Sequence, residues 1–194
     1  MRTLLTLLLL ATLLVGAPYA QAQLQPGDAL PEATTSFSTV TGATVQLADI
    51  QGEQGLVVVL WGADCPWVDR YEERLLALVG DYRSQGFGFA LVDPTPAADV
   101  DAAARTEQAR RYGDLPYLVD PSGRLARALG AARQPEVFVF DGNGTLAYQG
   151  ALDDSASDPS FVEIDYARDA LDALGAGGTP PEATAAAFGC SLRL

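Results

Sequence analysis

The sequence contains no histidine and no lysine, so all twelve of its basic residues are arginine. The absence of histidine excludes Ser-His-Asp and Cys-His catalysis, and it excludes histidine-ligated zinc, non-haem iron and haem. With two cysteines, the chain cannot supply a four-thiolate zinc or iron–sulfur site by itself. We therefore expect no metal and no cofactor. The function classes that remain are thiol chemistry, carboxylate chemistry and binding without catalysis.

Positive charge is also scarce, and the formal net charge of the 194 residues is −13. Such an acidic surface repels phosphate backbones and anionic lipid headgroups, which argues against nucleic acids and membrane surfaces as partners. The acidic run at residues 153–158 lacks the ligand spacing of a known calcium loop. We interpret that run as a solvated acidic turn.

The amino-terminal apolar run is too short to span a membrane. It covers residues 4–15, about 12 residues, whereas a spanning helix needs roughly 20. Arg2 precedes it and Ala20-Gln21-Ala22 follows it as a small-x-small cleavage site. We expect residues 1–22 to be a cleaved signal peptide. The mature protein would then be exported, to the periplasm or the extracellular space, without stable membrane insertion.

The most informative stretch joins a buried strand to an amphipathic helix. Residues 56–61 form a short apolar run rich in β-branched side chains, and apolar residues then recur every three or four positions over residues 67–79. Pro66 suits the first position of that helix. Cys65 is therefore placed at a helix N-terminus, where N–H groups and the helix dipole stabilise a thiolate, although Asp64 beside it acts in the opposite direction.

The remainder of the chain alternates strands and helices, which predicts one layered α/β domain over residues 23–180. Residues 35–47 read as a hairpin that turns at Thr41-Gly42. A Gly/Pro-rich tail, residues 181–194, carries Cys190. Later strands are predicted at 87–92, 115–119, 137–140 and 146–148, and helices at 100–112, 124–129 and 164–174.

Residues 61–68, WGADCPWV, support a family comparison. They resemble the Trp-x-x-x-Cys-Pro-x-Cys active-site turn of thioredoxin-like proteins. The resemblance is greatest to exported thiol:disulfide oxidoreductases and the related redoxin (AhpC/TSA) group. It implies a thioredoxin-like fold, with a central mixed β-sheet flanked by helices on both faces and an extra N-terminal hairpin. Val68 stands in place of the second cysteine, so the usual local dithiol cycle is excluded.

The same resemblance implies a substrate-binding surface around Cys65. Pro135 corresponds to the cis-proline that faces the active-site cysteine, where the neighbouring backbone pairs with a substrate's extended chain. The alternative is an ordinary trans proline that opens a strand. The predicted substrate-binding residues are Trp61, Pro66, Trp67, Gln134 and Pro135, with a core position as the alternative for the two tryptophans.

Three roles for Cys190 are open from the sequence. It could form a structural disulfide with Cys65, it could resolve an oxidised Cys65 from the tail, or it could stay free or bond another chain. The ending Phe188-Gly189-Cys190-Ser191 resembles the C-terminal Gly-Cys motif of some redoxins that carry Cys-Pro-x-Val.

Three functional hypotheses follow. The first is an exported thiol-disulfide oxidoreductase that acts through Cys65 on a protein or small-molecule disulfide or thiol substrate. The second is an antioxidant thiol peroxidase, although Val58 and Gly62 replace the proline and threonine of the peroxiredoxin Pro-x-x-x-Thr-x-x-Cys loop. The third is a redox-inert binding module that uses the groove beside Pro135.

Overall fold

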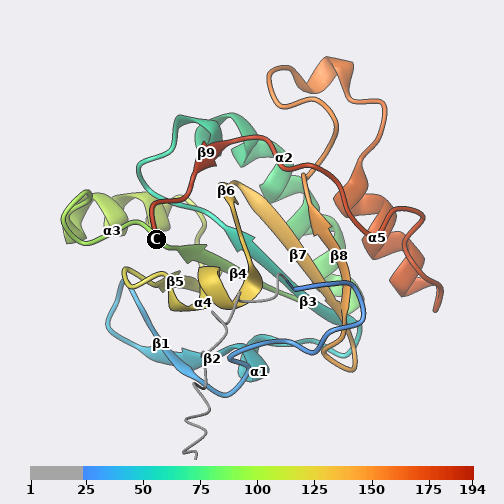
Figure 1. Ribbon diagram of the computed structural model, residues 1–194, viewed down its shortest axis with the longest axis horizontal. Coiled ribbons are helices and arrows are strands. Elements are labelled where there is room, and N and C mark those ends of the chain that lie inside the picture. Colours follow the sequence, from blue (N-terminus) through green and yellow to red (C-terminus); the bar gives the residue numbers. More distant parts are fainter. Residues whose placement is uncertain (1–23) are drawn as a thin grey trace, which may run out of the picture.

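The computed structural model describes residues 24–194 (Figure 1), so the predicted signal peptide at residues 1–22 lies outside the described part of the chain. Its centre is a seven-stranded mixed sheet in the order β2-β1-β5-β4-β3-β7-β8. Strands β3, β4 and β5 run parallel, while β7 and β8 at one side and β1 and β2 at the other pair antiparallel. The predicted mixed sheet is confirmed.

The strands fall into two sheets. A short second sheet pairs β6 with β9, far apart in the sequence. The strand bounds are β1 Ser36–Thr39, β2 Thr44–Gln46, β3 Gly55–Leu60, β4 Phe87–Asp93, β5 Tyr117–Val119, β6 Arg133–Gln134, β7 Glu136–Asp141, β8 Leu146–Gly150 and β9 Cys190–Ser191.

Helices cover both faces of the large sheet. Successive side chains of β3 point to opposite sides, so the strand contributes to a separate core on each face. Val57 and Val59 pack with α2, α3 and α5, whereas Leu56 and Val58 pack with α1 and α4. The helices are α1 Leu47–Ile50, α2 Pro66–Tyr82, α3 Ala102–Arg110, α4 Arg124–Leu129 and α5 Tyr166–Gly175, with 3₁₀ turns η1 Arg83–Gln85 and η2 Pro159–Phe161.

The predicted elements are present, with different ends for some of them. The hairpin β1–β2 turns at Thr41-Gly42 as predicted, and Gly42 adopts a φ of 80° that suits glycine. The helix predicted at 100–112 begins at Ala102 as α3, because the side chain of Asp101 accepts the backbone N–H of Ala104. Within residues 24–194, no helix is both long enough and apolar enough to cross a bilayer.

The C-terminal tail is part of the packed structure. Ala183 and Ala185 exchange backbone hydrogen bonds with Gln149 at the outer edge of β8. The tail, red in Figure 1, then runs across the molecule past β6, forms β9 and ends near α3. It therefore brings Cys190 to the start of α2.

Candidate active site

Cys65 lies at the junction between β3 and α2. The strand ends at Leu60, and Pro66 occupies the first turn of the helix. Cys65 itself is the extended N-cap residue, with φ −109° and ψ 114°. Its sulfur is thus held beside the N-terminus of a 17-residue helix, where the helix dipole favours a thiolate.

The structure joins Cys65 to Cys190 in a disulfide. The two residues are 125 positions apart in sequence, and their Cα atoms are 6.0 Å apart. Cys65 is only 4% exposed, while Cys190 is partly exposed on the tail. Of the three roles open from the sequence, a free Cys190 is therefore excluded in this state.

Gln134 and Pro135 face this disulfide. The peptide bond between them is cis, and both residues are buried. The Sγ atom of Cys65 lies 3.2 Å from the carbonyl oxygen of Gln134. Because a disulfide sulfur carries no proton, this approach is a packing contact and not a hydrogen bond. The sequence-predicted neighbours Cys65, Cys190, Gln134 and Pro135 are therefore brought together.

The turn before Pro135 is fixed by Glu136. The carboxylate of Glu136 accepts the backbone N–H groups of Ala132 and Arg133, at 2.8 and 2.9 Å. Burial raises the pKa of Glu136 above its ordinary value, although these two hydrogen bonds oppose the change. The result is a fixed position for the two-residue strand β6.

The side chain of Gln134 packs beneath the Cys65 turn. Its Nε2 atom donates to Asp64 at 2.9 Å, while its buried Oε1 atom has no protein hydrogen-bond partner. A Cβ atom on Gly62 would lie 2.1 Å from Oε1. A side chain at position 62 would therefore displace the Gln134 amide from this position.

Asp64 links three segments around the disulfide. Besides Gln134, its carboxylate accepts the Thr95 hydroxyl at 3.1 Å and the Arg193 guanidinium at 2.8 Å. Arg193 also lies 3.1 Å from Asp99. The sequence predicted that Asp64 opposes thiolate formation at Cys65. Arg193 places a compensating positive charge beside it.

A buried ion pair supports the loop that carries Thr95. The Nε atom of Arg105 donates to Asp93 at 2.8 Å, and both side chains are almost fully buried. Asp93 also accepts the backbone N–H of Thr95 at 2.9 Å. This pair fixes the segment after β4 against the Cys65 turn.

The two tryptophans have different positions. Trp67 is partly exposed, with Phe188 edge-on at 4.6 Å and the Arg70 guanidinium 5.0 Å from its ring centre. Trp61 is fully buried and packs edge-on against Tyr112. The prediction that Trp61 contacts substrate is therefore wrong, because its side chain continues the inward face of β3.

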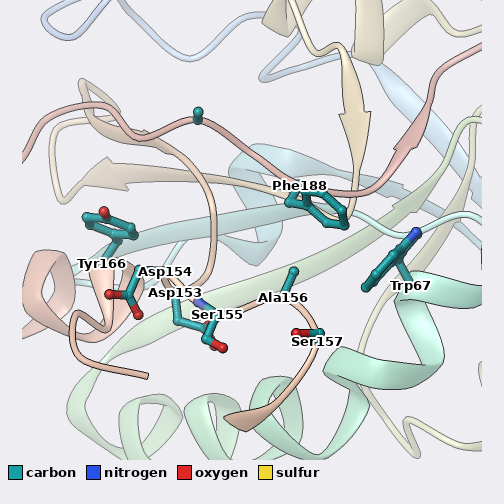
Figure 2. A pocket seen from close by; sticks show the side chains of 9 residues that line it. Trp67, Asp153, Asp154, Ser155, Ala156, Ser157, Tyr166 and Phe188 are labelled. Atoms are coloured by element: carbon teal, nitrogen blue, oxygen red, sulfur yellow. The ribbon is translucent and has the colours of Figure 1, made fainter. Parts of the chain in front are cut away.

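An open pocket of about 480 Å³ adjoins the tail near Trp67 (Figure 2). Trp67 and Phe188 lie at one end and Tyr166 at the other, with the loop at residues 153–157 between them. The sequence predicted a solvated turn here, but Asp153 is buried and pairs with Arg74 at 2.6 Å. That interpretation is wrong for Asp153, because α2 supplies an arginine that the sequence could not place.

Sequence reasoning missed the charged contacts of the tail. Arg193 lies 129 positions after Asp64, and only the path of the tail brings them together. The Gly189-Cys190 dipeptide is compatible with a close approach of two backbones, which the structure shows between Gly189 and Gln134. Within residues 24–194, no group of three or more Cys, Asp or Glu residues is arranged to hold a metal ion.

The fold is similar to several solved structures. An uncharacterised conserved protein from Geobacillus kaustophilus is 26% identical, with TM-score 0.79 and coverage of 89% of this chain and 94% of that chain. A hypothetical protein from Sinorhizobium meliloti 1021 is also 26% identical, with TM-score 0.78 and coverage of 87% and 94%. A comparison with curated proteins gives no match.

A third structure has a more distant likeness. It is a secreted disulfide oxidoreductase from Mycobacterium tuberculosis, described as homologous to DsbE of Escherichia coli. It is 17% identical, with TM-score 0.54 and coverage of 75% of this chain and 97% of that chain. At that identity the likeness shows a shared fold. The sequence model of the AhpC/TSA family matches residues 26–149, more than half of the sequence. The chain therefore belongs to the AhpC/TSA family of thioredoxin-like redoxins.

Proposed function

We propose that the protein is a thiol-disulfide oxidoreductase in which Cys65 is the nucleophile and Cys190 is the resolving thiol. The observation that carries the proposal is the bond between Cys190 and the one sulfur at the N-terminus of α2. Val68 occupies the usual place of the resolving cysteine, and the tail supplies a thiol to the same sulfur from 125 residues away.

The proposed cycle moves two electrons from the protein to a disulfide substrate. The Cys65 thiolate attacks one substrate sulfur, the substrate disulfide breaks, and its other sulfur leaves as a thiolate. The Cys190 thiolate then attacks Cys65 in the mixed disulfide and releases the second substrate thiolate. The Cys65–Cys190 disulfide forms, and an external dithiol reduces it to complete the cycle.

Two features of the site support Cys65 as the nucleophile. The α2 N-terminus stabilises negative charge on its sulfur. The second feature is position, because the Gln134 carbonyl oxygen lies 3.2 Å from the Cys65 sulfur and places that sulfur against the backbone of β6. Cys65 is then positioned beside a backbone edge to which an extended substrate can pair.

The test compares the wild type with Cys65→Ser and Cys190→Ser in turnover of a disulfide-bonded peptide, with a dithiol as reductant. We expect Cys65→Ser to lose turnover with an unchanged circular dichroism spectrum. In a single turnover without the dithiol, Cys190→Ser should accumulate a mixed disulfide between Cys65 and the peptide, because no thiol is present to resolve it. Wild-type turnover in a chain that lacks both cysteines would overturn the proposal in favour of a redox-inert module.

Peroxidase activity, the second candidate function, is tested in the Cys190→Ser variant. Cys190→Ser is treated with a stoichiometric hydroperoxide, and sulfenic acid at Cys65 is trapped with a selective carbon nucleophile. We expect disulfide exchange to be faster than sulfenic acid formation, because Gly62 supplies no hydroxyl group to polarise a peroxide. Rapid trapping of sulfenic acid would favour the antioxidant peroxidase.

We also propose that the protein is exported and that residues 1–22 are its signal peptide. The mature chain would consist of the redoxin domain, residues 23–180, and the tail, residues 181–194. Disulfides form and persist in oxidising compartments outside the cytoplasm, so the Cys65–Cys190 disulfide supports this proposal. N-terminal sequencing of the secreted or periplasmic protein should begin at Gln23. Recovery of an intact N-terminus from the cytoplasm would contradict it.

A further inference from the structure

The short strand β6 is a backbone edge that the tail covers. In the described chain, Gln134 pairs with Cys190 and Arg133 with Ser191 in antiparallel register. The backbone N–H of Leu192 also donates to the carbonyl oxygen of Ala132 at 3.1 Å. Backbone pairing of this kind accepts any extended segment, and side-chain contacts then determine which segment fits.

The position before the cysteine is restricted to glycine. A Cβ atom on Gly189 would lie 2.2 Å from the carbonyl oxygen of Gln134 and 3.1 Å from Cδ of Pro135. The first of these neighbours is backbone, held in place by the pairing with β9, so it cannot move without loss of that pairing. A segment with a side chain at this position cannot bring its own cysteine to Cys65 in the same register.

The third position after the cysteine meets a negatively charged receptor. Arg193 lies 2.8 Å from Asp64 and 3.1 Å from Asp99, which come from two different loops. The whole chain carries a net charge of −13, which attracts basic segments over a longer range. An arginine or lysine is therefore favoured at this position, and an acidic residue is repelled.

The second position before the cysteine meets an aromatic surface. The Phe188 ring lies edge-on to Trp67 at the end of the open pocket in Figure 2. Phe188 remains 53% exposed, so this contact covers one side of the ring. An aromatic residue is favoured here, with weaker selection than at the glycine position.

We propose that the groove along β6 binds extended, basic polypeptide segments of the pattern aromatic-Gly-Cys-x-x-Arg, and that residues 188–193 are its internal occupant. This inference rests on the proposed function and adds a substrate class to it. The disulfide keeps the tail in the groove. After reduction, the pairing of β6 with β9 and an exposed ion pair hold the tail, so a substrate segment competes with it.

The test uses the full chain with Cys190→Ser and peptides whose single cysteine carries a coloured aromatic thiol as leaving group. The reference peptide is AAFGCSLRL, residues 186–194 of the tail. Three other peptides each carry one substitution, which replaces the glycine by valine, the arginine by glutamate, or the phenylalanine by serine. Each rate with the protein is divided by the rate of the same peptide with glutathione, which corrects for intrinsic reactivity.

We expect the valine peptide to react at least about tenfold more slowly than the reference, because the added side chain overlaps backbone. The glutamate peptide should be about fivefold slower, with a difference that shrinks in high salt. The serine peptide should show the smallest loss. Asp99→Arg in the protein should restore part of the rate of the glutamate peptide, because it removes one of the two receptor carboxylates and supplies a guanidinium, while Asp64 remains.

Release of the tail is tested in the same assay. Gly189→Val combined with Cys190→Ser should react faster with every peptide than Cys190→Ser does, because its own tail no longer fits the groove. Equal corrected rates for all four peptides would overturn the inference while Cys65 reactivity stands. Failure of every peptide to react, in a folded protein, would overturn the proposed function and this inference with it.

A second measurement avoids the Cys190→Ser variant. The wild-type chain is titrated, oxidised and then reduced, against a fluorescent AAFGSSLRL peptide, and binding is followed by anisotropy. We expect binding to the reduced chain and at least about tenfold weaker binding to the oxidised chain, in which the Cys65–Cys190 disulfide holds the tail in the groove. Equal binding to both forms would contradict an internal occupant.

Discussion

Strands β3 and β9 lead to the same disulfide, but different forces hold them in place. Strand β3 is buried along its whole length between β4 and β7, and its side chains fill both faces of the core. Strand β9 is two residues long and pairs with β6 alone in the described chain. One sulfur is therefore fixed by the core, and the other lies on a segment that bond cleavage can release.

This difference suits a resolving thiol. A nucleophile needs a constant environment, which the core provides for Cys65 through the end of β3 and the start of α2. A resolving thiol must leave the site so that a substrate can enter, and the tail carries few buried contacts that would prevent this. The predictions below separate the contribution of the core from that of the tail.

The largest effect is expected from loss of the disulfide. Cys190→Ala should lower the free energy of unfolding of the oxidised protein by about 4 to 5 kcal/mol, the loop-entropy value for a loop of this length. Denaturant unfolding with and without a dithiol measures it. Reduced wild type should match the variant. A variant as stable as the oxidised wild type would show that the tail bond does not restrain the unfolded chain.

Leu56→Ala tests the core side of the comparison. Leu56 is fully buried in β3, so its truncation should cost about 2 to 5 kcal/mol in unfolding experiments. The loss should be equal in the oxidised and reduced protein, because Leu56 lies between β4 and β7 in the centre of the sheet, which both redox states share. A loss confined to the oxidised form would contradict the separation of core and tail.

Two glycines give a matched test of the Cys65 turn. Gly62→Ala places a methyl group against the Gln134 amide and should cost about 1 to 3 kcal/mol, with slower disulfide exchange at Cys65. Gly80→Ala, in α2 with open space around it, should instead stabilise the protein by up to about 1 kcal/mol. Thermal unfolding and exchange rates measure both. Equal effects at the two positions would contradict the packing described for Gln134.

The smallest effect concerns alkaline pH. Burial raises the pKa of Tyr71 and of Tyr82 to about 12, and Asp153 and Asp172 respectively add to the increase. An unfolded tyrosine titrates near 10, so between pH 10 and 12 the folded state keeps protons that the unfolded state releases. Stability should therefore be unaffected below pH 10 and fall as the pH rises to 12, equally in both redox states. Phenolate absorbance measures the ionisation of the two tyrosines, and thermal unfolding measures the stability. Ionisation of both phenols near pH 10 in the folded protein would contradict the prediction.

The sequence predicted the core side of the site better than the tail side. The β3–α2 junction follows from a local apolar run and Pro66, so the position of Cys65 could be inferred directly. Trp61 was misassigned although the alternation of Val57, Val59 and Trp61 places it on an inward face. Tail contacts such as Arg193 to Asp64 depend on how distant segments pack, and no local pattern records them.

The most direct test of the account is the equilibrium reduction potential of the Cys65–Cys190 pair, measured against dithiol redox buffers with the oxidised fraction followed by thiol alkylation. A working redox pair should titrate between about −120 and −270 mV, the range of disulfide oxidoreductases. A potential below about −300 mV, in the range of structural disulfides, would contradict the account. Cys190 would then be a permanent link between the tail and the core.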